Sequence, residues 1–365
     1  MLSTPHLSSL MPDSTSPAGN NAIKHLLEQL RRHPKRVVFT EGEDVRVIEA
    51  AARLVKQEAA TPILLGRPER IRTIAGLNHI PLDFIKITDP KKSSDLPLFV
   101  KRAENMGRYR ASHQVDTEET IVRPHYFGSM MVQYGHADAI VGGNQAIPAA
   151  YFRALLHNIK PKEDVPRIFG VTILTAPHFP LLGENGVLFL ADTGLIPNPD
   201  MTQLSTIAIE TGKLAHHFLG RRPTVALLSH STKGTSTTLE AQKVVAATAL
   251  AKGRVVSELL DMDVDGELQA DVAIDPEAAE TKLPDAAKRH TADVLVFPNL
   301  DAAHISLKLL QHLGGAQNYG QLILGLSRPA AQVPRTASVE TIFGTAAAVA
   351  VEAIKYHELY PESDF

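Results

Sequence analysis

Short apolar runs alternate with segments of helical periodicity along most of the chain. The apolar runs at 36–40 and 61–65 are predicted strands, and the apolar spacing at 45–55 and 69–75 predicts amphipathic helices. Consecutive parallel strands need a crossover connection, which is usually a helix, and such helices cover both faces of a sheet. The alternation therefore predicts an α/β fold built on a parallel-rich sheet.

The same pattern continues along the chain, with a Pro-bounded linker expected at 161–166. Further helices are predicted at 21–32, 98–109, 124–134, 149–158, 204–218 and 237–251, and two more after the predicted caps Asp301 and Ser338. Further strands are predicted at 139–141, 168–174, 187–190, 224–228, 255–260, 295–297 and 322–324. The strands at 168–174 and 187–190 are close enough to form a hairpin-like pair.

Composition excludes several classes of protein. The 365 residues contain 44% apolar and 21% charged residues with a net charge of −3, and no basic run favours nucleic acid. No window reaches the roughly 20 apolar residues of a membrane span. The chain has no cysteine, which excludes disulfides, thiolate metal sites and a cysteine nucleophile. Residues 1–20 read as a flexible tail without signal-peptide features, so we expect a cytoplasmic protein.

One loop has the composition of an anion site. Ser231, Thr232, Lys233 and Gly234 follow the predicted strand at 224–228 and precede a helix, where free N–H groups favour anions. The same residues also fit an ordinary turn that caps the helix, and the sequence leaves both interpretations open. His230 is the histidine nearest to such a site, although a structural role fits it as well.

Known catalytic signatures are otherwise missing. The sequence contains no Walker motif, no G-x-G-x-x-G after a strand and no G-x-S-x-G. Adjacent His216 and His217 do not share a helix face, so no metal site is expected. Arg110, Arg153 and Arg335 lie near predicted helix or loop edges and suit phosphate binding, but their spacing alone does not bring them together.

Several longer motifs occur in an order that identifies a family. They are Glu41-Gly42-Glu43-Asp44-Val45-Arg46, Ala137-Asp138-Ala139-Ile140-Val141-Gly142-Gly143, Leu190-Ala191-Asp192, Asn198-Pro199-Asp200, Leu228-Ser229-His230-Ser231-Thr232-Lys233-Gly234, Asp265-Gly266-Glu267-Leu268-Gln269-Ala270-Asp271, Phe297-Pro298-Asn299-Leu300 and Leu324-Gly325-Leu326. From about residue 35 to 354 the chain resembles the phosphate acetyl/butyryltransferase family.

This resemblance implies both a fold and a reaction. The fold would have two α/β domains, related to isocitrate/isopropylmalate dehydrogenases, with an interdomain cleft and a homodimeric assembly. We expect domain 1 at 21–163 plus 326–365 and domain 2 at 164–325. The reaction would move an acyl group, acetyl in particular, between acyl phosphate and coenzyme A. A base would deprotonate the thiol, whose thiolate attacks directly, without metal, cofactor or covalent intermediate.

Family site residues carry over unevenly. The resemblance assigns substrate binding to Arg110, Arg153 and the loop at 231–234, and it places that loop opposite Arg335. The serine that stabilises the transition state is replaced by Pro334, and the aspartate expected as base is replaced by Thr341. Glu340 and His230 are the candidate substitutes, with Arg335 as the third catalytic candidate.

Two hypotheses follow from these departures. The first is a phosphate acyltransferase with a remodelled acid/base end. The second is a weakened or inactive regulator that binds acetyl-CoA, because 228–231, 298–303 and the region around Pro334 are similar to the C-terminal domain of large NADP-dependent malic enzymes. A dehydrogenase is disfavoured, because the chain has no nicotinamide-cofactor signature.

Overall fold

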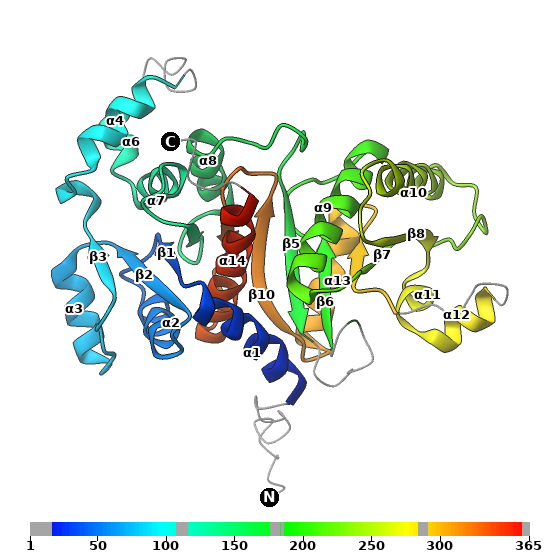
Figure 1. The fold of residues 1–365 in the computed structure, drawn as a ribbon, viewed down its shortest axis with the longest axis horizontal. Helices are drawn as coiled ribbons and strands as arrows, with labels where there is room; N and C mark the ends of the chain where they lie inside the picture. Colours follow the sequence, from blue (N-terminus) through cyan, green and yellow to red (C-terminus); the bar gives the residue numbers. More distant parts are fainter. Residues whose placement is uncertain (1–16, 107–115, 176–182, 184–185, 284–290, 360–365) are drawn as a thin grey trace, which may run out of the picture.

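The computed structural model describes residues 17–106, 116–175, 183, 186–283 and 291–359, which build one mixed sheet with helices on both faces (Figure 1). The described part of the sheet has 11 strands in the order β3-β2-β1-β4-β11-β10-β5-β6-β9-β7-β8. The strands are β1 Lys35–Phe39, β2 Ala60–Leu65, β3 Lys86–Thr88, β4 Ala139–Gly142, β5 Phe169–Thr175, β6 Val187–Ala191, β7 Thr224–Leu228, β8 Asp263–Leu268, β9 Val294–Val296, β10 Gln317–Leu324 and β11 Ala330–Gln332. The predicted α/β class is confirmed.

Helices connect most of these strands, as the alternation predicts. They are α1 Pro17–Arg32, α2 Val45–Lys56, α3 Pro68–Leu77, α4 Leu96–Glu104, α6 Thr117–Ile121, α7 Pro124–Gln133, α8 Pro148–Asn158, α9 Met201–Leu219, α10 Leu239–Ser257, α11 Ala270–Ile274, α12 Pro276–Lys282, α13 Leu300–His312 and α14 Val339–Leu359, with a 3₁₀ turn at Pro90–Lys92. Within the described residues, no helix combines the length and the apolar character needed to cross a membrane.

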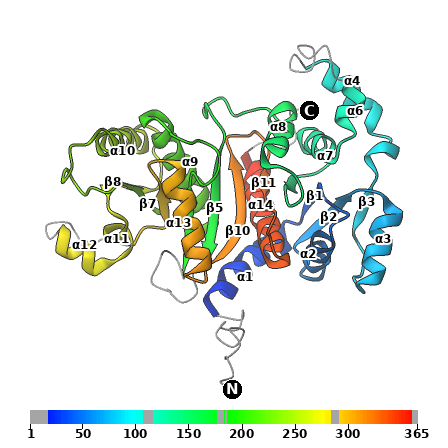
Figure 2. The ribbon, with the colours of Figure 1, turned by 180° about the vertical axis from the view of Figure 1, so that it is seen from behind.

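The sheet contains two parallel blocks that run in opposite directions. Strands β3, β2, β1, β4 and β11 form one block, and β6, β9, β7 and β8 form the other. Between them, β11 pairs antiparallel with β10, β10 with β5, and β5 with β6 (Figures 1 and 2). Three antiparallel steps reverse the strand direction, so the carboxyl ends of the two blocks lie at opposite edges of the sheet.

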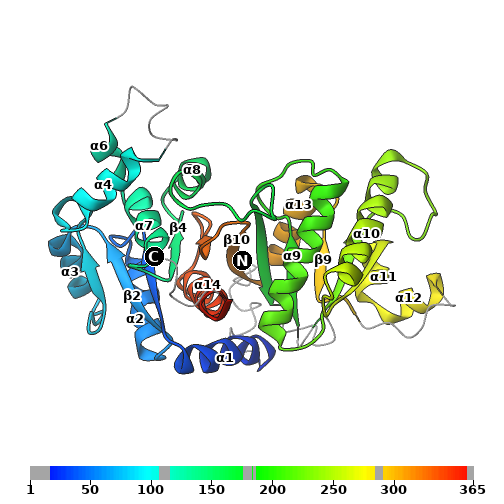
Figure 3. The same ribbon diagram turned by 45° about the horizontal axis from the view of Figure 1, so that its top comes forward.

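The largest apolar cluster joins both blocks. It includes buried side chains of α2, α9 and the Ala-rich α14, which packs against β10 and α2. Helix α1 packs on α14 and runs from beside α2 toward α9 (Figure 3). A second cluster lies beneath α4, α7 and α8, and a third lies between α13 and the second block. Burial at this scale fixes the strand ends that carry the site described below.

The structure corrects two local predictions. The strand predicted at 255–260 is wrong, because α10 continues through Ser257 and the next strand, β8, begins only at Asp263. Val244, Ala247 and Ala251 keep the helical spacing of buried positions. Helix α13 is capped by Asn299, whose Oδ1 accepts from Ala302 N at 2.9 Å, rather than by Asp301.

Other local predictions are confirmed or extended. Asp44 and Asp200 cap α2 and α9, and Asp200 does so in a full capping box. The predicted hairpin-like pair is the antiparallel pair β5–β6. The helix expected at 98–109 is α4, and 107–109 lie outside the described residues. The division into two domains stays a prediction.

Candidate active site

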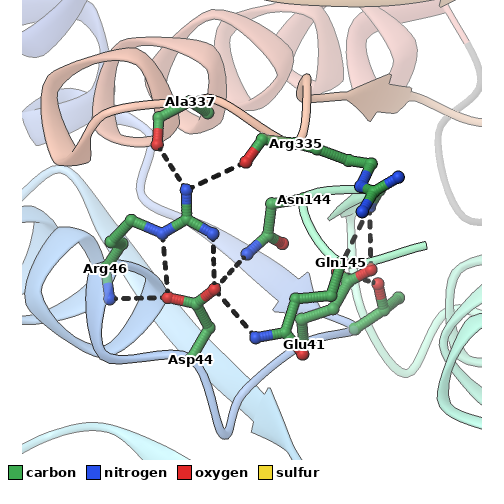
Figure 4. A network of polar contacts seen from close by, with 9 residues as sticks. Glu41, Asp44, Arg46, Asn144, Gln145, Arg335 and Ala337 are labelled. Atoms are coloured by element: carbon green, nitrogen blue, oxygen red, sulfur yellow. Dashed lines mark hydrogen bonds and ion pairs between the residues drawn. The ribbon is translucent and has the colours of Figure 1, made fainter.

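Three adjacent parallel strands end at one edge of the sheet and bring polar residues together there. Val38 of β1 aligns with Ile140 of β4, which aligns with Ala330 of β11. The residues after these strands therefore meet, as ligand-binding groups do at the carboxyl ends of strands in open α/β sheets. Figure 4 shows the resulting network, with Glu41 after β1, Asn144 after β4 and Arg335 after β11. We call this group of residues the β1/β4/β11 edge.

Asp44 and Arg46 organise the edge. The Asp44 carboxylate accepts from Arg46 Nε at 3.1 Å and Nη2 at 2.7 Å, and also from Asn144 Nδ2 at 2.8 Å and Gln145 Nε2 at 2.9 Å. Burial alone would raise the pKa of Asp44, but the hydrogen bonds from Arg46 and Gln145 outweigh burial and lower it. Asp44 is therefore an ionised anchor that holds the Arg46 guanidinium in one orientation.

Arg46 in turn fixes the chain on either side of residue 336. Its Nη1 donates to the backbone oxygens of Arg335 at 3.1 Å and Ala337 at 2.8 Å (Figure 4). These carbonyls precede α14, so Arg46 links α2 to the β11–α14 connection. The position of the Arg335 side chain therefore depends on an ion pair made by two residues that are distant in sequence.

Glu41 is a second carboxyl group at this edge, in a different environment. Its side chain is 7% exposed, and it accepts from Thr40 Oγ1 at 2.6 Å and Gly143 N at 3.0 Å. Burial raises the pKa of Glu41, and these hydrogen bonds only partly counter the rise. His125 Nδ1 lies 3.8 Å from Glu41 Oε1, and burial lowers the pKa of that imidazole. Burial thus favours the neutral forms of both groups.

Arg335 is free to bind an anion here. Its side chain is exposed, makes no ion pair with the described residues, and extends away from Arg46 toward the side of Gln145 and Glu41 (Figure 4). A planar guanidinium without a carboxylate partner can bind phosphate through two parallel hydrogen bonds. Of the three catalytic candidates from the sequence, Arg335 is the one that lies at the β1/β4/β11 edge.

The other expected phosphate-binding arginines are placed differently. Arg153 is exposed on α8, and it has no ion pair within the part of the chain that the structure describes. Tyr151 of the same helix is fully buried, and its hydroxyl donates to Ala331 O at 2.9 Å. Residues two apart on a helix are about 200° apart, so Arg153 faces away from the β11 side. Arg110 lies outside the described residues.

The hydrogen-bond donors of the loop at 231–234 are already paired with acidic side chains and a carbonyl oxygen of β8, in the same parallel block. Glu267 is buried, and its Oε1 accepts from Ser231 Oγ at 2.9 Å and Gly234 N at 2.7 Å. Lys233 Nζ pairs with Asp265 and donates to Gly266 O at 2.7 Å. The donors that a phosphate would need are therefore already bound to carboxylates and carbonyls of β8, and this geometry favours the capped-turn interpretation of the loop.

The loop also does not face Arg335. It follows β7 in the second parallel block, so it lies at the opposite edge of the sheet from the carboxyl end of β11. Figures 1 and 3 place the β7–α10 connection far from α8 and α14. The expected wall of Ser231, Thr232, Lys233 and Gly234 opposite Arg335 is thus not formed within this chain.

The two candidate substitutes for the catalytic base are also bound elsewhere. His230 Nε2 lies 3.1 Å from Ser236 Oγ, within the same β7–α10 connection. Glu340 accepts from Arg53 Nη2 at 2.7 Å across the α2–α14 contact. The Thr341 hydroxyl lies 3.2 Å from Ser338 Oγ. The start of α14 therefore presents no unpaired carboxylate beside Arg335.

Sequence reasoning missed Glu41, His125 and Asn144 as site residues. A usable signal was present, because Glu41 and Asn144 follow two predicted parallel strands and so belong to the same sheet edge. His125 gave no comparable signal, since it stands at the second position of α7 and reaches Glu41 only through tertiary packing. Among the described residues, no group of three or more histidines and acidic residues could hold a metal ion.

Comparison with known proteins gives one consistent result. The family model described as phosphate acetyl/butaryl transferase matches residues 21–350. A phosphate acetyltransferase of Acetivibrio thermocellus is 35% identical over 331 residues, which cover 91% of this chain and 98% of that protein. A phosphate acetyltransferase of Staphylococcus epidermidis is 33% identical over 335 residues, covering 90% and 98%.

Solved structures agree with this result. The EutD phosphotransacetylase of Staphylococcus aureus superposes with a TM-score of 0.80 at 31% identity, covering 91% of this chain and 98% of that one. A 4-hydroxythreonine-4-phosphate dehydrogenase of Klebsiella pneumoniae has a TM-score of 0.50 at 13% identity, covering 88% and 97%. The second likeness supports the fold alone.

Proposed function

Because the chain belongs to the phosphate acetyl/butyryl transferase family, we propose that it moves an acetyl group between acetyl phosphate and coenzyme A at the β1/β4/β11 edge. The family match and relatives that align along nearly their whole length place the chain among acyltransferases of the phosphate acetyltransferase type. The choice of acetyl, the direct thiolate attack and the location of the site are our proposals.

One observation supports the location most strongly. Arg335 is exposed, lacks an ion partner among the described residues and lies in a segment whose backbone Arg46 holds. In the proposed reaction Arg335 binds the phosphate of acetyl phosphate and neutralises the charge that grows on it as the C–O bond breaks. A fixed backbone beneath a free guanidinium keeps the phosphate in one position relative to the attacking thiol.

The test is the formation of acetyl-CoA from acetyl phosphate and coenzyme A. We expect CoA-dependent release of phosphate by the purified full chain, and a lower kcat/KM for propionyl and butyryl phosphate. Arg335→Ala is expected to lower kcat/KM by about a hundredfold or more, in the range seen when a preorganised charge-stabilising donor is lost. Absence of acetyl-CoA formation above background with all three acyl phosphates would refute the proposal.

A second candidate function is an acetyl-CoA-binding regulator without turnover. It is favoured by the start of α14, where Glu340 is paired with Arg53 and the Thr341 hydroxyl is paired with Ser338. Titration calorimetry separates the two candidates. A regulator binds acetyl-CoA but releases no phosphate, whereas the proposed enzyme does both. The expected homodimer is tested separately by light scattering at several protein concentrations.

A further inference from the structure

A buried carboxyl group and a half-buried imidazole lie close together at the β1/β4/β11 edge. Glu41 Oε1 and His125 Nδ1 are 3.8 Å apart, and the two side chains are 7% and 21% exposed. His125 Nδ1 is buried without a hydrogen-bond partner in the described structure, and so is Asn144 Oδ1. Buried polar atoms are nearly always paired. His125 Nδ1 thus lies 3.8 Å from Glu41 Oε1 with a hydrogen-bonding capacity that no described residue uses.

The charged and titratable groups around Glu41 come from four elements. They are Asp44 and Arg46 from the β1–α2 region, His125 from α7, Tyr151 from α8 and Arg335 from the β11–α14 connection. Asp44 is held ionised by Arg46, and burial keeps the pKa of Tyr151 well above its usual value. Burial raises the pKa of Glu41 and lowers the pKa of His125, which brings the two pKa values closer together. These two neighbouring groups are therefore the pair best matched for a proton transfer.

We propose that Glu41 is the general base that accepts the thiol proton of coenzyme A, and that His125 positions Glu41 and passes the proton to solvent. This proposal rests on the proposed function, because it names the base of that reaction. It also explains how the site could work without an acidic residue at position 341, where Thr341 stands.

The other candidates for this role are excluded by their contacts. Glu340 is neutralised by Arg53, and His230 lies at the opposite edge of the sheet from Arg335. Asp44 is surrounded by donors from Arg46, Asn144 and Gln145, which stabilise its charge and make it a poor proton acceptor. Glu41 has fewer donors and a burial-raised pKa, closer to that of a thiol.

The proton and electron changes balance without a further reactant. Glu41 takes the proton of the S–H bond, and the freed electron pair of sulfur forms the C–S bond to the acetyl carbonyl carbon. The carbonyl re-forms as the C–O bond to phosphate breaks, and phosphate leaves with that electron pair beside Arg335. The proton on Glu41 moves to His125 Nδ1, and His125 releases the proton of its other ring nitrogen, Nε2, to water, which restores the carboxylate of Glu41.

The first test compares two glutamates that are two residues apart. Glu41→Gln keeps the shape and the acceptor oxygen of the side chain but cannot take a proton. Glu43→Gln is the matched control, because Glu43 is paired with Arg67 and Arg70 at the surface. We expect Glu41→Gln to lower kcat by about 10²–10⁴-fold with the acetyl-CoA dissociation constant unchanged within about threefold. Glu43→Gln should leave both quantities close to wild type.

The outcomes separate this proposal from the proposed function. If the wild type forms acetyl-CoA and Glu41→Gln retains kcat within about fivefold of the Glu43→Gln control, Glu41 is not the base, although the function stands. If the wild type forms no acetyl-CoA, the function fails and the catalytic role of Glu41 fails with it. Thermal unfolding of each variant shows whether a lost rate reflects a lost fold.

A second variant keeps the test open if Glu41→Gln does not fold. His125→Phe puts an apolar ring in place of the imidazole that would accept the proton of Glu41. The Glu41 carboxyl group then becomes harder to ionise. The acidic limb of the kcat/KM profile should move to higher pH in His125→Phe relative to wild type. An unmoved limb in a folded, active His125→Phe variant would overturn the proposed pairing.

Discussion

Arg46→Ala should destabilise the protein far more than an exposed arginine substitution does. The Asp44 and Arg46 side chains are 6% and 31% exposed, so removing the guanidinium leaves a nearly buried carboxylate without its cation. Removing one partner of a buried ion pair costs roughly 3–5 kcal/mol. Because Arg46 is partly exposed, and because Asn144 and Gln145 still donate to Asp44, we expect about 2–4 kcal/mol at pH 7.

Urea unfolding at pH 7 measures this difference, with Arg67→Ala as the control. Arg67 pairs with Glu43 at the surface and its side chain is 58% exposed, so its ion pair is screened by solvent and contributes little to stability. In a double-mutant cycle, Asp44→Asn and Arg46→Ala should be coupled by more than about 1 kcal/mol. Arg46→Ala costing no more than Arg67→Ala, with coupling near zero, would refute the argument that Asp44 is an ionised anchor.

The pH dependence gives an independent check with a definite sign. The folded-state pKa of Asp44 is lowered in the wild type, so its stabilisation is present above its unfolded pKa of about 3.9 and is lost as pH falls through the folded value. In Arg46→Ala, burial is no longer outweighed and the pKa of Asp44 rises. The stability gap between the two proteins should therefore narrow as pH falls from 7 toward 4.

Three further predictions concern the surroundings of the site. Glu340→Gln removes the ion pair with Arg53, whose two side chains are 40% (Arg53) and 38% (Glu340) exposed, so it should lower the free energy of unfolding by less than about 1 kcal/mol. The rate of acetyl-CoA formation should stay within about threefold of wild type. A large loss of rate would show that Glu340 belongs to the catalytic site. Glu267→Ala deprives the Ser231 hydroxyl and the Gly234 N–H of their acceptor and should lower stability by about 1–3 kcal/mol in urea unfolding, whereas no change would show that the loop does not depend on β8. Gly142→Ala would place a Cβ 2.2 Å from Thr40 Oγ1 and should destabilise the protein by about 1–3 kcal/mol. The control Gly76→Ala in α3 places its Cβ in open space and should stabilise the protein slightly. Equal effects of the two substitutions in thermal unfolding would contradict this packing.

Local sequence patterns predicted most of the fold, because each of these elements has a short-range signal. Asp44 and Asp200 were identifiable as caps, and the helix predicted at 45–55 is α2. Its buried face includes Val47, Ile48, Ala51 and Leu54, whereas the stripe predicted from the sequence was Val45, Ile48, Ala52 and Val55, of which Ile48 alone is buried. The same logic failed at 255–260, where an apolar run that extends a long helix looks like a strand until its neighbours are known. The short strand β11 carries no periodic signal over three residues.

The site could be predicted only in part, because it is made by strand order. Arg335 and the family motif around Asp44 and Arg46 were recognisable in the sequence, but their contact depends on β11 lying next to β4. The loop at Ser231–Gly234 looked like an anion site on composition alone. Its acceptors Glu267 and Asp265 lie more than 30 residues away, and they become its partners only because β8 pairs with β7.

The measurement that tests the account most directly compares acetyl-CoA formation by the wild type, Arg335→Ala and Lys233→Ala under the same conditions. In the proposed enzyme, acetyl transfer takes place at the edge that carries Arg335, whereas Lys233 forms an ion pair with Asp265 in the other block. We therefore expect a wild-type rate above background, a loss of about a hundredfold or more in Arg335→Ala, and a rate within about threefold of wild type in Lys233→Ala. A wild type without activity, or a loss in Lys233→Ala alone, would contradict this expectation.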